Sequence, residues 1–159
     1  MTSLDLLKNC PLFFELYDKE IAKIVKHCSV YNFNDGEKII EDGEEGNQIF
    51  VVLEGEAMVE KYTSEGRIQI QLLQSGDVFG EMALMGEKTR QADIVSSGPS
   101  HILEIEYESI FILFKKEPRI FGLLLFNCAR LISKRLASLN KTIVELRNEV
   151  NRLQSEKAA

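Results

Sequence analysis

The chain has 159 residues, of which 45% are hydrophobic, and a formal net charge of −6. This length suffices for one globular domain and an appendage, and the acidic balance argues against a protein whose main task is to hold nucleic acid. The most apolar run, residues 120–132, is interrupted by Asn127 and Arg130 well short of the roughly 20 residues of a membrane span, and no signal-peptide pattern opens the chain, so we expect a cytoplasmic protein with no membrane partner.

Residues 3–27 have a helical pattern. Within them Ile21, Ile24 and Val25 fall on one stripe, and Asp18 is available as an N-cap. A helical segment is therefore predicted ahead of the main domain.

Residues 28–106 change to a β pattern. Short β-rich segments recur about every 8 to 12 residues, at 29–33, 37–41, 48–54, 56–63, 67–73, 92–97 and 101–106. Turn pairs such as Asp35-Gly36 and Glu54-Gly55 divide them. This pattern predicts a mainly β domain, an antiparallel sandwich or jelly roll with flanking helices.

The last part, from about Tyr107, contains no glycine after Gly122 and no proline after Pro118. It predicts a short helix, a break at Pro118 and one long helix of about 38 residues, roughly 57 Å long. We accordingly divide the chain into a β domain with N-terminal helices at 1–118 and a long helix at 119–159.

The long helix contains a heptad seam. Its apolar positions alternate in spacings of four and three residues: Ile132, Leu136, Leu139, Ile143, Leu146, Val150 and Leu153. Heptad position a is mostly β-branched and heptad position d is leucine, and this combination favours a parallel homodimer through residues 132–153. Packing along the chain's own β domain explains the stripe only as far as about Leu136, and a different coiled-coil protein is an alternative partner.

The segment "FGEMALMGEKTRQA", residues 79–92, carries the most specific chemistry. A Walker-A loop is excluded because no adjacent Gly-Lys-Ser/Thr is present. Gly80 permits a tight turn, Glu81 can accept a hydrogen bond from a hydroxyl, and Arg90 can bring donors to an anion. The alternative is an ordinary surface hairpin in which Glu81 and Arg90 form a weak, exposed ion pair.

This segment resembles the phosphate-binding cassette of the cyclic nucleotide-binding domain family. The flanking "DGEKIIEDGEEGNQIFVVLEGEAMV" and "SGDVFGE" are also similar, so that the resemblance runs from about Leu12 to Leu139. It implies an eight-stranded jelly roll in which Gly80 and Glu81 hold the ribose, the backbone N–H groups of Ala83 and Gln91 bind the cyclic phosphate, and Arg90 neutralises it. The long helix would close over the purine.

Two features qualify the implied ligand. Gln91 stands where the family usually has Ala, Ser or Thr, and because Thr there is associated with cGMP, its absence favours cAMP. Alignment of the long helix places Leu139 and Asn140 at the base; the alternative for Asn140 is a solvated heptad position. The implied ligand-binding set is Gly80, Glu81, Met82, Ala83, Arg90, Gln91 and Asn140.

No other chemistry is expected. His27 and His101 are isolated and "EDGEEGN" lacks the pattern of a calcium loop, so no metal site is predicted. No activated nucleophile is recognisable, and the chain ends at Ala159 without a DNA-reading element. We therefore expect a non-catalytic regulatory module that senses a cyclic nucleotide and signals through its last helix to an unidentified effector. The alternative is a structural dimerisation module of the same fold that binds no nucleotide.

Overall fold

The computed structural model describes residues 3–158 and begins with three short helical pieces. These are α1 (Ser3–Asn9), the 3-10 helix η1 (Pro11–Phe13) and α2 (Asp18–Val25). The predicted N-cap at Asp18 is wrong by one residue. Tyr17 caps α2, and its backbone N–H donates to the Glu20 carboxylate over 2.9 Å, which satisfies one of the free donors at the start of the helix.

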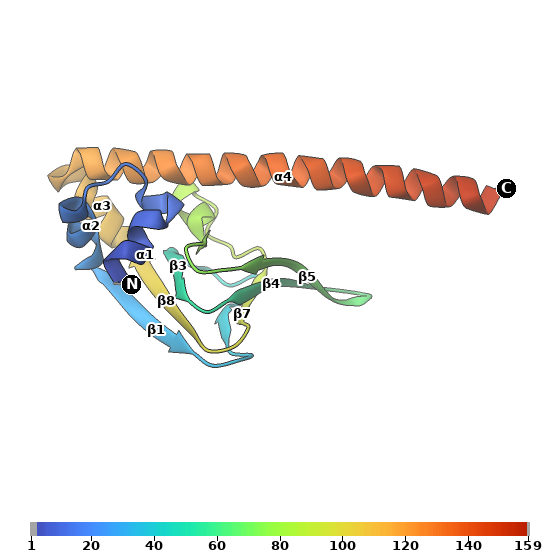
Figure 1. Ribbon diagram of the computed structural model, residues 1–159, viewed down its shortest axis with the longest axis horizontal. Coiled ribbons are helices and arrows are strands. Elements are labelled where there is room, and N and C mark those ends of the chain that lie inside the picture. Colours follow the sequence, from blue (N-terminus) through green and yellow to red (C-terminus); the bar gives the residue numbers. More distant parts are fainter. Residues whose placement is uncertain (1–2, 159) are drawn as a thin grey trace.

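Eight antiparallel strands form two four-stranded sheets (Figure 1), and this confirms the predicted β fold with flanking helices. The strands are β1 (Cys28–Phe33), β2 (Lys38–Ile40), β3 (Gln48–Glu54), β4 (Ala57–Thr63), β5 (Gly66–Leu73), β6 (Val78–Phe79), β7 (Asp93–Ser96) and β8 (Ser100–Glu106). One sheet has the order β1-β8-β3-β6 and the other β2-β7-β4-β5. The short β6 lies outside the predicted segments.

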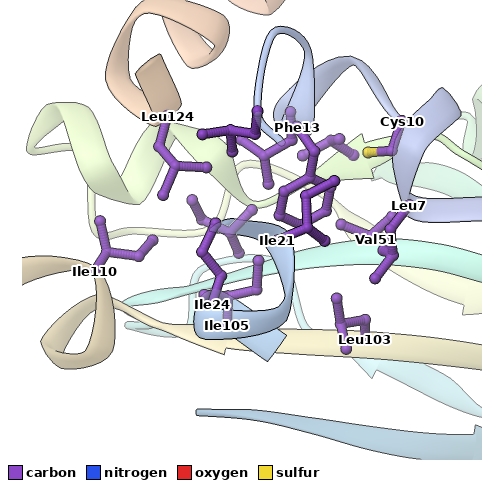
Figure 2. Close-up of a cluster of buried hydrophobic side chains, with 14 of the residues drawn as sticks. Leu7, Cys10, Phe13, Ile21, Ile24, Val51, Leu103, Ile105, Ile110 and Leu124 are labelled. Atoms are coloured by element: carbon purple, nitrogen blue, oxygen red, sulfur yellow. The ribbon is translucent and has the colours of Figure 1, made fainter. Parts of the chain in front are cut away.

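Strand β3 shows why the domain has two apolar layers. Its sequence is an unbroken apolar run, and side chains of a strand alternate between the two faces of a sheet. Ile49 and Val51 point to the helices, whereas Phe50 and Val52 point to the space between the sheets. The layer under the helices, seen in Figure 2, includes Val51 together with residues of α1, η1, α2 and α4. The helices are thus held against the sheet by apolar burial.

The three cysteines are free. Cys10 and Cys128 are buried, and Cys28 is half-buried. Burial raises the pKa of the Cys10 thiol to about 11 and those of Cys28 and Cys128 to about 12, so all three stay protonated thiols at neutral pH.

Two helices complete the chain, α3 (Tyr107–Lys116) and α4 (Pro118–Ala158). The first half of α4 packs on the domain through Ile120, Leu124 and Cys128, and the buried amide of Asn127 donates to the Leu12 and Phe14 carbonyls over 3.0 and 2.8 Å. The second half extends past the domain (Figure 1). No helix within residues 3–158 combines the length and the apolar character that crossing a membrane requires.

The predicted heptad seam lies on this extended half. Its residues from Leu136 onward are exposed by 44% to 62%: Leu136, Leu139, Ile143, Leu146, Val150 and Leu153. A stripe of large apolar side chains thus remains in contact with water in the single chain.

Candidate ligand site

A sharp turn positions the first two candidate residues. Strand β6 ends at Phe79, Gly80 adopts a left-handed conformation with φ 74°, and the 3-10 helix η2 (Glu81–Met85) follows. A Cβ at position 80 would lie 2.7 Å from the Arg90 guanidinium and 2.8 Å from the Gln48 carbonyl oxygen. Gly80 is therefore required both by its backbone conformation and by the close approach of Arg90.

Arg90 is buried, with 7% of its surface exposed. One of its terminal nitrogens donates to the Gln48 carbonyl over 3.0 Å and the other to the Gly80 carbonyl over 3.3 Å, while the Phe50 ring lies 5.6 Å below the guanidinium carbon. Burial lowers the pKa of Arg90 from its ordinary value, and nearby carboxylates, Glu44 foremost, oppose this shift. The guanidinium stays charged, because arginine does not lose its proton in proteins.

Glu81 is buried more deeply, with 2% exposed. Its Oε1 accepts a hydrogen bond from Arg135 of α4, and the same guanidinium donates to the Val78 carbonyl oxygen. Arg135 therefore ties α4 to the turn that carries Glu81.

The exposed ion pair between Glu81 and Arg90, the alternative suggested by the sequence, is absent from this arrangement. Both side chains are buried, and each has its own partners. Each nevertheless keeps one buried polar atom without a hydrogen-bond partner among the described residues, Oε2 of Glu81 and Nε of Arg90. Such unsatisfied buried atoms are rare and costly in folded proteins, so they indicate a missing partner.

The two side chains share one cavity of about 170 Å³. Sheet β2-β7-β4-β5 contributes an apolar wall, formed by Ile40, Val59, Leu73 and Ile94. Six of the seven predicted ligand residues line the cavity, namely Gly80, Glu81, Met82, Ala83, Arg90 and Gln91. Asn140 is not among the lining residues; it is exposed on α4, and Arg135 is the residue of that helix at the cavity.

The backbone near the predicted phosphate position is partly engaged. The N–H of Ala83 donates to the Gly80 carbonyl over 3.3 Å, a long hydrogen bond. The side chain of Gln91 donates to the Thr89 carbonyl over 3.1 Å, and its backbone carbonyl accepts from Lys61 over 2.8 Å. Lys61 thus fixes the segment that follows Arg90.

Sequence reasoning missed three residues of the site. Gly46 lies against Arg90, and a Cβ at position 46 would stand 2.5 Å from the guanidinium. Gln48 accepts hydrogen bonds from that guanidinium. These contacts join distant parts of the chain, and no local pattern indicates them. Arg135 could have been found, because the spacing of the buried α4 positions Ile120, Leu124, Cys128 and the half-buried Leu131 continues to residue 135.

Residues 3–158 contain no group of three or more His, Cys, Asp or Glu side chains that could hold a metal ion.

A family model described as "Cyclic nucleotide-binding domain" matches residues 30–117. Among curated proteins, the chain is similar to the cAMP-dependent protein kinase regulatory subunit of Mycosarcoma maydis, at 36% identity over 92 residues that cover 58% of this chain and 18% of the relative. It is also similar to human cGMP-dependent protein kinase 2, at 36% identity over 99 residues that cover 60% of this chain and 12% of the kinase. The chain therefore spans less than a fifth of these relatives.

A similar solved structure is the catabolite activator protein of Thermus thermophilus. The two share 26% sequence identity with a TM-score of 0.75, and the match covers 86% of this chain and 62% of that protein. The likeness thus extends beyond the residues that the family model matches.

Proposed function

Because this chain belongs to the cyclic nucleotide-binding domain family, we propose that its cavity binds a cyclic nucleotide, with cAMP preferred over cGMP, and that α4 signals occupancy to a partner. The observation that carries this proposal is that Arg90 and Glu81, each of which has a buried polar atom without a described partner (Nε and Oε2), line one cavity. A cyclic nucleotide has one phosphate charge and a nearby ribose hydroxyl, which would supply an acceptor to the arginine and a donor to the carboxylate.

The charges of the cavity support a ligand with a single negative charge. The guanidinium of Arg90 is desolvated and hydrogen-bonded only to neutral oxygens, so an anion beside it gains a charge-assisted hydrogen bond in a low-dielectric setting. The Glu81 carboxylate opposes a second negative charge nearby, while its Oε2 can accept from a hydroxyl. The cyclic phosphate diester therefore suits the cavity better than a phosphate monoester.

The preference for cAMP rests on Gln91. This residue lines the cavity next to Arg90, where a threonine would favour cGMP in the family, and its amide is bound to the Thr89 carbonyl. The purine would lie against the apolar wall of the second sheet.

Signalling through α4 rests on Arg135. Glu81 has two carboxylate oxygens, of which Arg135 holds one and the ligand hydroxyl would take the other. Ligand and α4 would then share one side chain, so occupancy would change the position or strength of the Arg135 contact. The exposed seam beyond Leu136 would pass this change to a second copy in a parallel coiled coil, and through it to an effector.

Calorimetric titration of the purified chain with cAMP, cGMP and 5′-AMP tests the proposal. We expect one cAMP per chain, weaker binding of cGMP and still weaker binding of 5′-AMP, whose monoester carries more negative charge toward Glu81. Tighter binding of cGMP would overturn the stated preference. If a folded chain binds neither cyclic nucleotide, the proposal fails and the exposed seam supports the alternative, a structural dimerisation module.

A further inference from the structure

A second and larger cavity lies between α4 and the N-terminal segment. Its volume is about 630 Å³, within the range typical of small-molecule sites. None of its lining residues belongs to the nucleotide cavity. Figure 1 shows the N-terminal helical segment beneath the first half of α4.

The walls of this cavity are apolar and aromatic. Pro11 and Phe14 line it from the N-terminal segment, and Phe126 and Leu131 line it from α4. Phe14 and Phe126 are each 55% exposed, an unusual state for two large side chains that border one hollow. The Asn127 amide, which holds the Leu12 and Phe14 carbonyls, fixes the two sides relative to each other, so the cavity is already formed.

Among the residues whose side chains the structure describes, three cations and no acidic residue line the cavity. Arg130 lies over the Phe126 ring at 4.2 Å and pairs with Glu15, and Lys8 pairs with Asp18 over 2.9 Å. Lys134 is exposed and has no hydrogen bond or ion pair with any described residue. Two of the cations have carboxylate partners, and Lys134 is the lining cation without one among the described residues.

The Arg130 guanidinium lies over both the Phe14 and the Phe126 rings, whereas Lys134 is separated from Phe126 along α4. Lys134 follows Phe126 by eight residues, or roughly 12 Å at the helical rise. An occupant that fits has an apolar body of about that length and a single anionic group at one end. An acidic amphipathic helix fits less well, because its several carboxylates would meet only one cation without a partner.

We propose that this cavity binds a medium-chain carboxylate, with the acyl chain against Phe14 and Phe126 and the carboxylate at Lys134. The site is independent of the nucleotide cavity. A bound chain bridges the N-terminal segment and α4, because residues of both line the cavity.

Titration of the full chain with octanoate, decanoate and dodecanoate below their micellar concentrations, followed by amide NMR, tests this proposal. Shifts should concentrate in residues 9–14 and 126–134 and be absent from 80–91, and affinity should rise up to about fourfold per added methylene. Dodecanol should bind about two- to fivefold more weakly than dodecanoate, because the ion pair that it lacks is with an exposed lysine.

Two variants and two controls separate binding from folding. Lys134→Ala should remove the preference for dodecanoate over dodecanol, and Phe126→Ala should weaken both at least tenfold; the exposed Lys141→Ala and Phe111→Ala should change neither. Equal affinity of the wild type for dodecanol, shifts confined to the seam at 136–153, or no shifts at all would overturn the proposal. So would an acidic amphipathic peptide that binds this cavity when dodecanoate does not.

Discussion

Replacement of Arg90 by leucine should separate ligand binding from folding. In the complex, the guanidinium would form a desolvated charge-assisted pair with the cyclic phosphate, so Arg90→Leu should cost roughly 2–5 kcal/mol of binding, a loss of about thirty- to several-thousand-fold in affinity. In the free protein its hydrogen bonds go to the neutral Gln48 and Gly80 oxygens, and the charge itself is desolvated. The loss of these bonds and the relief of that desolvation oppose each other, so the free energy of unfolding should change by no more than about 2 kcal/mol.

Thermal unfolding with and without cAMP measures both quantities. Ligand at 100 times its dissociation constant adds about 2.7 kcal/mol, which for a domain of this size raises the melting temperature by roughly 5–11 °C. Wild type should show this shift, and so should the control Arg152→Leu, whose side chain is 62% exposed near the end of α4. Arg90→Leu should show almost none. A folded Arg90→Leu protein with an unchanged cAMP affinity would refute the assignment of Arg90 to the phosphate.

Three further outcomes are expected. Truncation after Ala137 should give a folded monomer in light scattering, because it removes most of the seam, whereas a monomeric full chain at tens of micromolar would refute the dimer. Arg135→Ala should lower the free energy of unfolding, measured by urea titration, by about 1–3 kcal/mol, because it leaves the Glu81 carboxylate without its counter-charge. The double variant with Glu81→Gln should recover most of this loss. An unchanged urea midpoint for Arg135→Ala would mean that the pair is absent in solution. The hydrogen bond from the Asp42 N–H and, to a smaller extent, the Lys38 ammonium hold the pKa of Asp93 below its ordinary value of 3.8. The Asp93 carboxylate therefore stabilises the fold above about pH 4, and this stabilisation is lost as the pH falls through the lowered pKa. Asp93→Ala should therefore cost about 1.5–3 kcal/mol at pH 7 and progressively less on acidification, and a cost independent of pH would contradict the charge argument.

Local patterns in the sequence were sufficient for most of the fold. Alternating or continuous apolar runs between glycine turns predicted seven of the strands, because burial on one or both faces determines those runs. Strand β6 was not predicted, because it has only two residues, Val78 and Phe79, which is too short for a periodic pattern. It is defined by its pairing with Phe50 and Val51 of β3. The N-terminal helical segment was predicted as continuous, but Pro11 starts a separate 3-10 turn within it.

The site was predictable only as far as its motif extends. Gly80, Glu81 and Arg90 lie within eleven residues of one another; their type and spacing left a surface ion pair open, and the resemblance of the segment to the phosphate-binding cassette assigned them to a common ligand. Their partners are remote in sequence: Arg90 donates to Gln48, 42 positions away, and Glu81 accepts from Arg135, 54 positions away. Such pairings depend on how the sheets and α4 meet, which periodicity does not encode.

The separate partners of Glu81 and Arg90 bear directly on how a ligand could act on α4. If these two buried groups formed a pair with each other, an anionic ligand would have to break that pair, and the released carboxylate would be left without a counter-charge at considerable cost. Instead Arg90 donates its hydrogen bonds to neutral carbonyl oxygens, and Arg135 of α4 supplies the counter-charge of Glu81. Under the proposed function, the ligand would therefore enter without displacing a cation, and its hydroxyl would draw electron density from the carboxylate that anchors α4. Coupling between two sites is reciprocal. If pairing of the seam strengthens or releases the Arg135 contact, it should change the affinity for the nucleotide by some factor. The nucleotide should then change the affinity of seam pairing by the same factor.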